Sequence, residues 1–296
     1  MTEVQTEEIV ENKRRLTTSS PAGRTRRFIR CLRFEIAKTR RRALPWLGIL
    51  AAALAVFSVP AFSDLPLDAG ESWTELAEMV RRGFEISSLL LVILGASCVN
   101  CERQSSALRA YLLRPVARSE IVAAKAATLF LFALILIGTV LTIAWLVTKF
   151  RFGFGPVLVE IEGLDPVLKF DLESMRAMAL KLQLVATLPL FFFAALGLLV
   201  STLIDSEATA VTLAILSRMF FGFLAEAFPD SETLMGLRAI EIGYERCAET
   251  ARGIETQVQD IEALGFTHPE LLYPLFGFAL FLGVSKLTFC TRELNP

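Results

Sequence analysis

Six apolar runs, each about 20 residues long and nearly free of charge, constrain this chain more than any other feature. An α-helix needs about 20 residues to cross a hydrocarbon core roughly 30 Å thick. Because lipid offers the backbone no hydrogen-bond partners, such runs must be helices. The sequence therefore predicts an all-α fold, a polytopic integral membrane protein with six transmembrane helices. The expected spans are residues 44–63, 84–100, 126–148, 182–204, 208–228 and 271–289.

Composition agrees with a membrane protein. Hydrophobic residues make up 54% of the 296 residues, and the mean hydropathy is +0.54. Soluble domains contain roughly 45–50% apolar residues, so an ordinary soluble domain is excluded. The first 43 residues are polar and basic and lack the apolar core of a cleavable signal peptide. We therefore expect the first span to act as the targeting signal.

Basic residues are distributed unequally between the two sets of connecting segments. The segments on the N-terminal side of the membrane contain 19 lysines and arginines, and the opposite loops contain 10. Basic segments are retained on the cytoplasmic side, and an even number of spans returns the chain to that side. Both the N- and C-termini are therefore expected to be cytoplasmic, in a multi-pass protein of the cell (plasma) membrane.

The chain before the first span divides into two parts. Residues 1–23 are polar and are expected to form a disordered cytoplasmic tail. Residues 24–43 interleave arginines and lysines with apolar side chains, which is typical of an amphipathic N-terminal interfacial helix. The alternative is a charged stop sequence that only flanks the first span. Residues 44–296 then form the six-span membrane domain, which includes an external segment at 231–264.

Two of the expected external loops contain patterns of their own. The first has β-prone runs at 156–162 and 166–171, separated by Gly163-Leu164-Asp165-Pro166. This pattern predicts a small hairpin, with an irregular loop as the alternative.

The second patterned loop, 231–264, repeats apolar residues every seven positions in two series offset by three. Such an a/d seam over four heptads predicts a long external helix or helical pair, with any break at Gly243 or Gly253. The seam packs either on the chain's own external parts or on a second copy or another subunit. Its residues are Leu237, Ile240, Tyr244, Cys247, Ala251, Ile254, Val258 and Ile261.

Several classes of catalytic site lack the residues that they need. His268 is the only histidine, so a histidine-based catalytic or multi-histidine metal site is not expected. The five cysteines are scattered, and Cys98 and Cys101 have thioredoxin spacing but no βαβ pattern around them. The sequence also has no Gly-x-x-x-x-Gly-Lys-Ser/Thr phosphate loop. The chain is therefore expected not to be an enzyme, and to carry no metal or cofactor of its own.

The loop between the second and third spans has the most specific pattern. Leu108, Tyr111 and Leu112 share one helical face, and Pro115 ends that helix. These residues predict a short amphipathic helix held under the membrane. Arg118 and Lys125 then frame the start of the third span.

This loop resembles that of the type-2 class of ABC transporter permeases. The matching residues are Glu102, Leu112-Leu113, Pro115-Val116-Ala117-Arg118, Ile121 and Lys125. Ser106-Ala107 departs from the glycine step that the family has at this point. The six-span layout, the basic helix before the first span and the closing segment 289–294 extend the resemblance over most of the chain.

The resemblance implies the membrane subunit of an exporter. In that family, two permease chains pair, as two copies or two paralogues, and each rests on a separate ATPase subunit that holds ATP and Mg²⁺. The partners would be that subunit, a second permease chain and the lipid bilayer, and no nucleic acid. The loop transmits nucleotide-driven closure, which assigns coupling roles to Glu102, Leu108, Tyr111, Leu112, Pro115, Arg118 and Lys125. The alternative is a non-transporting membrane scaffold or sensor subunit that retains the permease fold.

One charged residue lies near the centre of a predicted span. Arg218 is in the fifth run, where an unpaired charge is costly and by default indicates function. Its candidate partners are Glu226, two turns further along the same helix, and Glu85 on another span. A structural ion pair, or an arginine whose head reaches one interface, is the other interpretation.

Overall fold

The computed structural model describes residues 21–62, 71–104, 117–159, 167–228, 234, 237–251 and 268–291. Within these residues, six helical segments are long and apolar enough to cross a membrane, which agrees with the predicted all-α, multi-pass class. They are α3 (Ala43–Phe62), α4 (Glu71–Gln104), α6 (Arg118–Val147) with the π-helical turn η1 (Thr148–Phe152), α7 (Leu172–Ala186) with α8 (Leu188–Leu203), α9 (Glu207–Ala227) and α12 (His268–Thr291).

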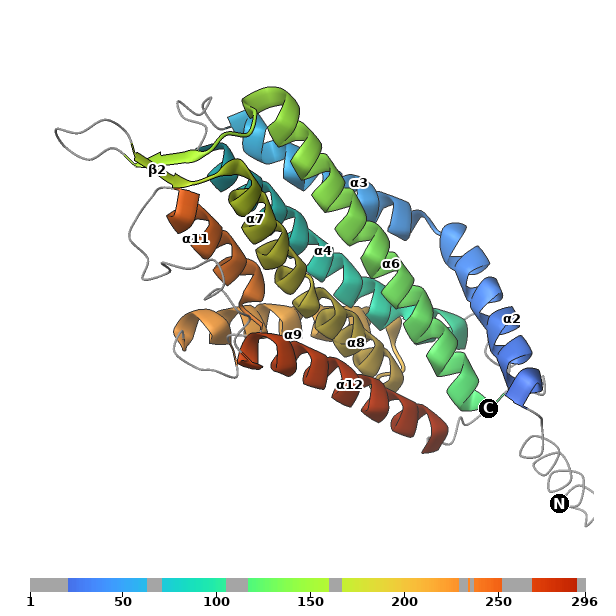
Figure 1. Ribbon diagram of the computed structural model, residues 1–296. Helices are drawn as coiled ribbons and strands as arrows, with labels where there is room; N and C mark the ends of the chain where they lie inside the picture. Colours follow the sequence, from blue (N-terminus) through green and yellow to red (C-terminus); the bar gives the residue numbers. More distant parts are fainter. Residues whose placement is uncertain are drawn as a thin grey trace, which may run out of the picture.

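A further helix, α2 (Pro21–Arg40), precedes the first span and lies at one end of the bundle, beside α6 and α3 (Figure 1). Proline is favoured at the first position of a helix because its fixed φ suits the helix and its missing N–H needs no partner there. The helix therefore begins three residues before the predicted boundary at 24. Residues 1–20 of the predicted tail are outside the described part of the chain.

Helix α4 is longer than predicted. The expected second span began at residue 84, but the helix already begins at Glu71, so treating 71–83 as an external loop was wrong. Buried side chains recur through this extension at helical spacing, at Trp73, Leu76, Ala77, Val80 and Phe84. Three of the charges between them pair with one another, because Glu78 lies 2.7 Å from Arg81 and 2.6 Å from Arg82. The third and fourth spans also begin earlier than predicted, at Arg118 and Leu172.

The fourth predicted span, 182–204, is two helices. α7 ends at Ala186 and α8 begins at Leu188, with Thr187 between them. Pro189 has no backbone N–H to bond the carbonyl one turn earlier, so it interrupts the helix. The predicted single helix was therefore wrong at this position, although the span as a whole, Leu172–Leu203, is long enough to cross a membrane.

Helices α4 and α8 form the centre of the bundle. Within the most apolar stretch of each span, 61% of the residues are buried for α4 and 78% for the span made of α7 and α8. The value is only 17% for α9 and for α12. The two helices touch backbone to backbone at Gly95 and Gly197. A Cβ on Gly197 would lie 2.4 Å from the Val92 carbonyl oxygen, and one on Gly95 would lie 2.8 Å from that of Ala194. Glycine is thus required at both positions for this close approach.

A two-stranded hairpin lies at the opposite end of the bundle from α2 (Figure 1). β1 (Val157–Val159) pairs antiparallel with β2 (Val167–Phe170), which confirms the predicted hairpin, while its predicted turn is outside the described residues. Asp171 follows β2 and caps α7, where its side chain accepts a hydrogen bond from the Ser174 N–H at 3.3 Å. That bond holds the pKa of the exposed Asp171 carboxyl below its usual value.

Helix α11 (Ala239–Ala251) packs on α4 and α7 at the hairpin end of the bundle. It passes through Gly243 without a break, and a Cβ there would lie 3.4 Å from the Leu182 carbonyl oxygen of α7. Of the predicted seam, Ile240 and Cys247 are buried, and Tyr244 is partly buried and packs against the same apolar core. The seam thus faces the chain's own helices over this stretch.

The remaining seam positions lie at or beyond the ends of α11. Leu237 is partly buried in the turn before the helix, and Ala251 is its last residue. Ile254, Val258 and Ile261 are outside the described part of the chain, as is Gly253. The predicted length of the external helix therefore stays a prediction beyond residue 251.

Candidate coupling site

Lys125 is fully buried at the end of the bundle where α2, α4 and α6 meet. Its ammonium donates hydrogen bonds to Glu102 Oε1 at 2.6 Å, to Glu35 Oε1 at 3.1 Å and to the Cys98 carbonyl oxygen at 3.2 Å. Lys38 also bonds Glu102 Oε1. We call Glu35, Lys38, Glu102 and Lys125 the ionic cluster.

The ionic cluster is balanced in charge, and the Lys125 ammonium at its centre uses all three of its hydrogen-bond donors. It contains two ammonium groups and two carboxylates, and the three N–H donors of Lys125 meet three acceptors. Burying ions costs several kcal/mol each, so a cluster of this kind requires close geometry and further hydrogen bonds to be tolerated. Removal of one member would leave the others with an uncompensated buried charge.

Further contacts hold α2, and the turn that follows it, to the ends of α4 and α6. The Arg42 guanidinium donates to Cys101 Sγ at 3.1 Å, and Arg27 lies 3.9 Å from Glu120 Oε1. Glu120 in turn accepts a hydrogen bond from the Ala117 N–H, which closes the first turn of α6. The Arg27 pair is partly exposed and contributes little by itself.

The residues predicted for coupling divide into two groups. Glu102 and Lys125, 23 positions apart in sequence, are brought into direct contact. Arg118 is the first residue of α6 and is partly buried. The others, Leu108, Tyr111, Leu112 and Pro115, are outside the described residues.

Sequence reasoning missed Glu35 and Lys38 as members of this site. A signal was present, because Glu35 is the only acidic residue in the strongly basic segment 24–43. A lone carboxylate on the apolar side of such a helix indicates a specific cationic partner. Glu35 is 3% exposed, whereas Arg33 and Phe34 beside it are exposed.

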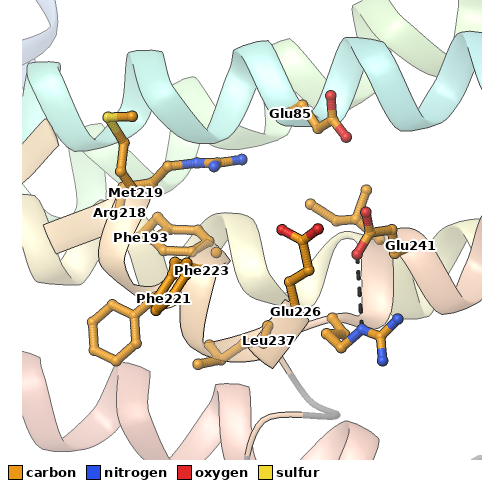
Figure 2. Close-up of a pocket in the computed structure, with 13 residues that line it drawn as sticks. Glu85, Phe193, Arg218, Met219, Phe221, Phe223, Glu226, Leu237 and Glu241 are labelled. Atoms are coloured by element: carbon orange, nitrogen blue, oxygen red, sulfur yellow. Dashed lines mark ion pairs between the residues drawn. The ribbon is translucent and has the colours of Figure 1, made fainter. Parts of the chain in front are cut away.

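Arg218 has neither of its predicted partners within the described residues. Its Nε donates to Ser88 Oγ at 3.2 Å, and its guanidinium carbon lies 5.9 Å from the centre of the Phe193 ring. Glu85 bonds Arg81 instead, at 2.8 Å. Arg218 lines a cavity of about 440 Å³ between α4, α8, α9 and α11, with Glu226 on the same wall (Figure 2).

Comparison with known proteins bears on the first half of the chain. Residues 31–164 match the model of a family described as ABC-2 family transporter protein, and these residues include the whole ionic cluster. No curated protein matches the chain. The predicted resemblance is thus confirmed: over residues 31–164 this chain is similar to ABC-2 family transporter proteins, the membrane permeases of ABC transporters.

Proposed function

We propose that this chain is the permease subunit of an ATP-driven exporter, and that the ionic cluster links the movement of a separate ATPase subunit to the membrane helices. The observation that carries the proposal is the buried contact of Lys125 with Glu102 and Glu35. This contact joins α2 to the end of α4 and to the first turns of α6, the two helices that the connection 105–116 links.

The ionic cluster makes these helices respond together. The ends of α4 and α6 flank the predicted coupling loop, and α2 is attached to both through Glu35 and Lys38. Breaking a buried ion pair costs about 3–5 kcal/mol, so the ionic cluster favours keeping the three helices joined at this point. A push on the loop therefore moves α2, α4 and α6 as one unit.

The basic bias of the connecting segments supports an orientation with both termini and the ionic cluster on the cytoplasmic side. There the loop would meet an ATPase subunit, which would hold ATP and Mg²⁺. The family match implies such a partner and a paired permease chain. The exposed apolar side chains of α9 and α12, such as Leu216, Phe220 and Phe276, leave wide surfaces for lipid or for that second chain.

The test is co-purification of the full-length tagged chain from its native membranes in a mild detergent. Mass spectrometry should identify an ATPase subunit, and the complex in liposomes should hydrolyse ATP and export a substrate. Arg118→Glu, or deletion of 105–113, should leave the complex inserted but abolish transport driven by ATP.

A matched control is Arg151→Glu, at the exposed end of η1 on the opposite side of the bundle. It reverses one basic charge in the same way and should leave transport near the wild-type rate. Wild-type transport by a well-expressed deletion variant would contradict the coupling role. A complex that contains no ATPase subunit would instead favour the scaffold or sensor alternative.

A further inference from the structure

The cavity beside α9 contains a cation and an anion that have no ion-pair partners among the described residues. They are Arg218 and Glu226, whereas the other charges of the cavity are paired. Glu85 pairs with Arg81 at 2.8 Å. Glu241 lies 3.8 Å from Arg238, and this ion pair is the dashed line in Figure 2. The cavity thus has two separate charges with which a ligand could pair.

The two charges are separated along one helix. Arg218 and Glu226 are eight residues apart on α9, which corresponds to about 12 Å along the helix axis. The wall between them is apolar and includes Phe221 and Ala225. A molecule that pairs with both charges must therefore carry its own charges at the two ends of an apolar body.

The space beside Arg218 is open because of Gly222. A Cβ at that position would lie 3.4 Å from Arg218 Nη1, so any larger side chain would enter the space next to the guanidinium. Ser88 fixes the opposite edge of the same group through Nε. Figure 2 shows the Arg218 side chain extending into the cavity, with Glu85 and Glu226 to either side of it.

A cation in the middle of a span is expensive unless it has a partner. The described residues provide a hydroxyl and an aromatic ring for Arg218 but no carboxylate. A bound anion would supply the missing charge, and a volume of about 440 Å³ is within the range of small-molecule sites.

We propose that this cavity binds an elongated zwitterion, with a carboxylate or similar anion at Arg218 and an ammonium group at Glu226. Its apolar chain would lie along Phe221 and the ring of Phe193. That such molecules are the exported substrate class rests on the proposed function; the binding itself does not.

Calorimetric titration of the full-length chain in nanodiscs at pH 7 tests the binding, with empty nanodiscs as the correction for partition into lipid. The probes are 8-aminooctanoate, which carries both charges, and octanoate and octylamine, which carry one each. We expect 8-aminooctanoate to bind at least roughly tenfold more tightly than either single-charge probe.

Variants test which end of 8-aminooctanoate pairs with which residue of the cavity. Arg218→Gln should reduce the affinity for 8-aminooctanoate to that of octylamine, and Glu226→Gln should reduce it to that of octanoate. Gly222→Leu should abolish binding by filling the cavity. The matched control Gly283→Leu, on α12 where no atom lies within 4 Å of an added Cβ, should bind as the wild type does.

Three results would each overturn the proposal. They are equal affinity for octanoate and 8-aminooctanoate, no binding of 8-aminooctanoate, and binding that Gly222→Leu retains. The ATPase subunit takes no part in this assay. A negative result would therefore remove the zwitterion site and leave the coupling role to its own test.

Discussion

Lys125 fixes the positions of three helices through one side chain. Its ammonium has an acceptor from α2 and two from α4, one of them a backbone carbonyl. The three donors of a lysine have no preferred plane, so they can meet acceptors from different directions, which a planar guanidinium could not do as readily.

We expect Lys125→Met to lower the free energy of unfolding by about 3–5 kcal/mol, because two buried carboxylates, Glu35 and Glu102, would lose the cation that they share. Denaturant unfolding in detergent, followed by the fluorescence of the tryptophans, measures the change. Lys286→Met is the matched control, since Lys286 is exposed, and should shift the value by less than about 0.5 kcal/mol. Equal losses in both variants would contradict the role given to the ionic cluster.

Cys247 is predicted to be unreactive in the folded protein. Its thiol is 2% exposed, points to the Trp73 carbonyl oxygen at 3.7 Å, and burial raises its pKa to about 12. Only the thiolate reacts readily, so at pH 8 a maleimide should label Cys247 at least roughly a hundredfold more slowly than the exposed Cys290. Oxidation of native membranes should likewise give no dimer through Cys247.

Variants that keep one cysteine each separate the two rates, and labelling after denaturation shows that the thiol is present and reduced. The raised pKa also has a consequence for stability. The buried neutral thiol makes its full contribution to the free energy of unfolding below about pH 9, where the thiol of the unfolded chain ionises. This contribution is lost as the pH rises towards about 12, the pKa of the folded state. Fast labelling at pH 8, or a Cys247 crosslink, would mean that α11 does not cover this thiol.

Among whole elements, the α4–α8 pair depends on two glycines. Gly197→Ala would place a methyl group 2.4 Å from the Val92 carbonyl oxygen, so the helices must move apart. We expect a loss of about 1–3 kcal/mol in the free energy of unfolding, measured as for Lys125. Gly138→Ala, where nothing lies within 4 Å, should be neutral or stabilising by up to about 1 kcal/mol. A neutral Gly197→Ala would show that the helices are not in backbone contact.

Periodicity identified the elements and misplaced several of their ends. The apolar runs marked all six spans, because lipid and core both require apolar side chains. The helix ends were not marked in the same way. In 71–83 the buried Trp73 and Leu76 are interleaved with charged residues, of which Glu78, Arg81 and Arg82 pair with one another, so a helix packed on its own chain resembled a polar loop in sequence.

The contacts between helices were harder to predict than the helices. Nothing in the spacing of Glu35 and Lys125, 90 positions apart, shows that they meet. Glu102 and Lys125 were singled out only through the resemblance to permeases. The predicted partners of Arg218 were wrong for a similar reason. Its charge suggested a carboxylate, whereas the packing of α9 on α4 places the Ser88 hydroxyl beside the guanidinium.

For the molecule as a whole, the arrangement predicts which segments share a side of the membrane. A reporter at residue 2 and one after Pro296 should both be cytoplasmic, and one inserted between β1 and β2 should be external. Accessibility of the three reporters to an impermeant reagent in intact cells measures this. The cytoplasmic pair act as controls for each other, and an external reporter after Pro296 would require an odd number of spans.

The contact at Gly95 also determines how α4 can move. Ser88, which holds Arg218, precedes Gly95 by seven residues, and Glu102 follows it by seven, so each lies about 10 Å from the crossing. The backbones of α4 and α8 touch at this crossing, and the two sites lie at equal distances on either side of it along α4. If α4 tilted as a rigid rod about this contact, the ionic cluster and the Arg218 cavity would be displaced by equal distances in opposite directions, so a 1 Å inward step at one end would open the other by about 1 Å.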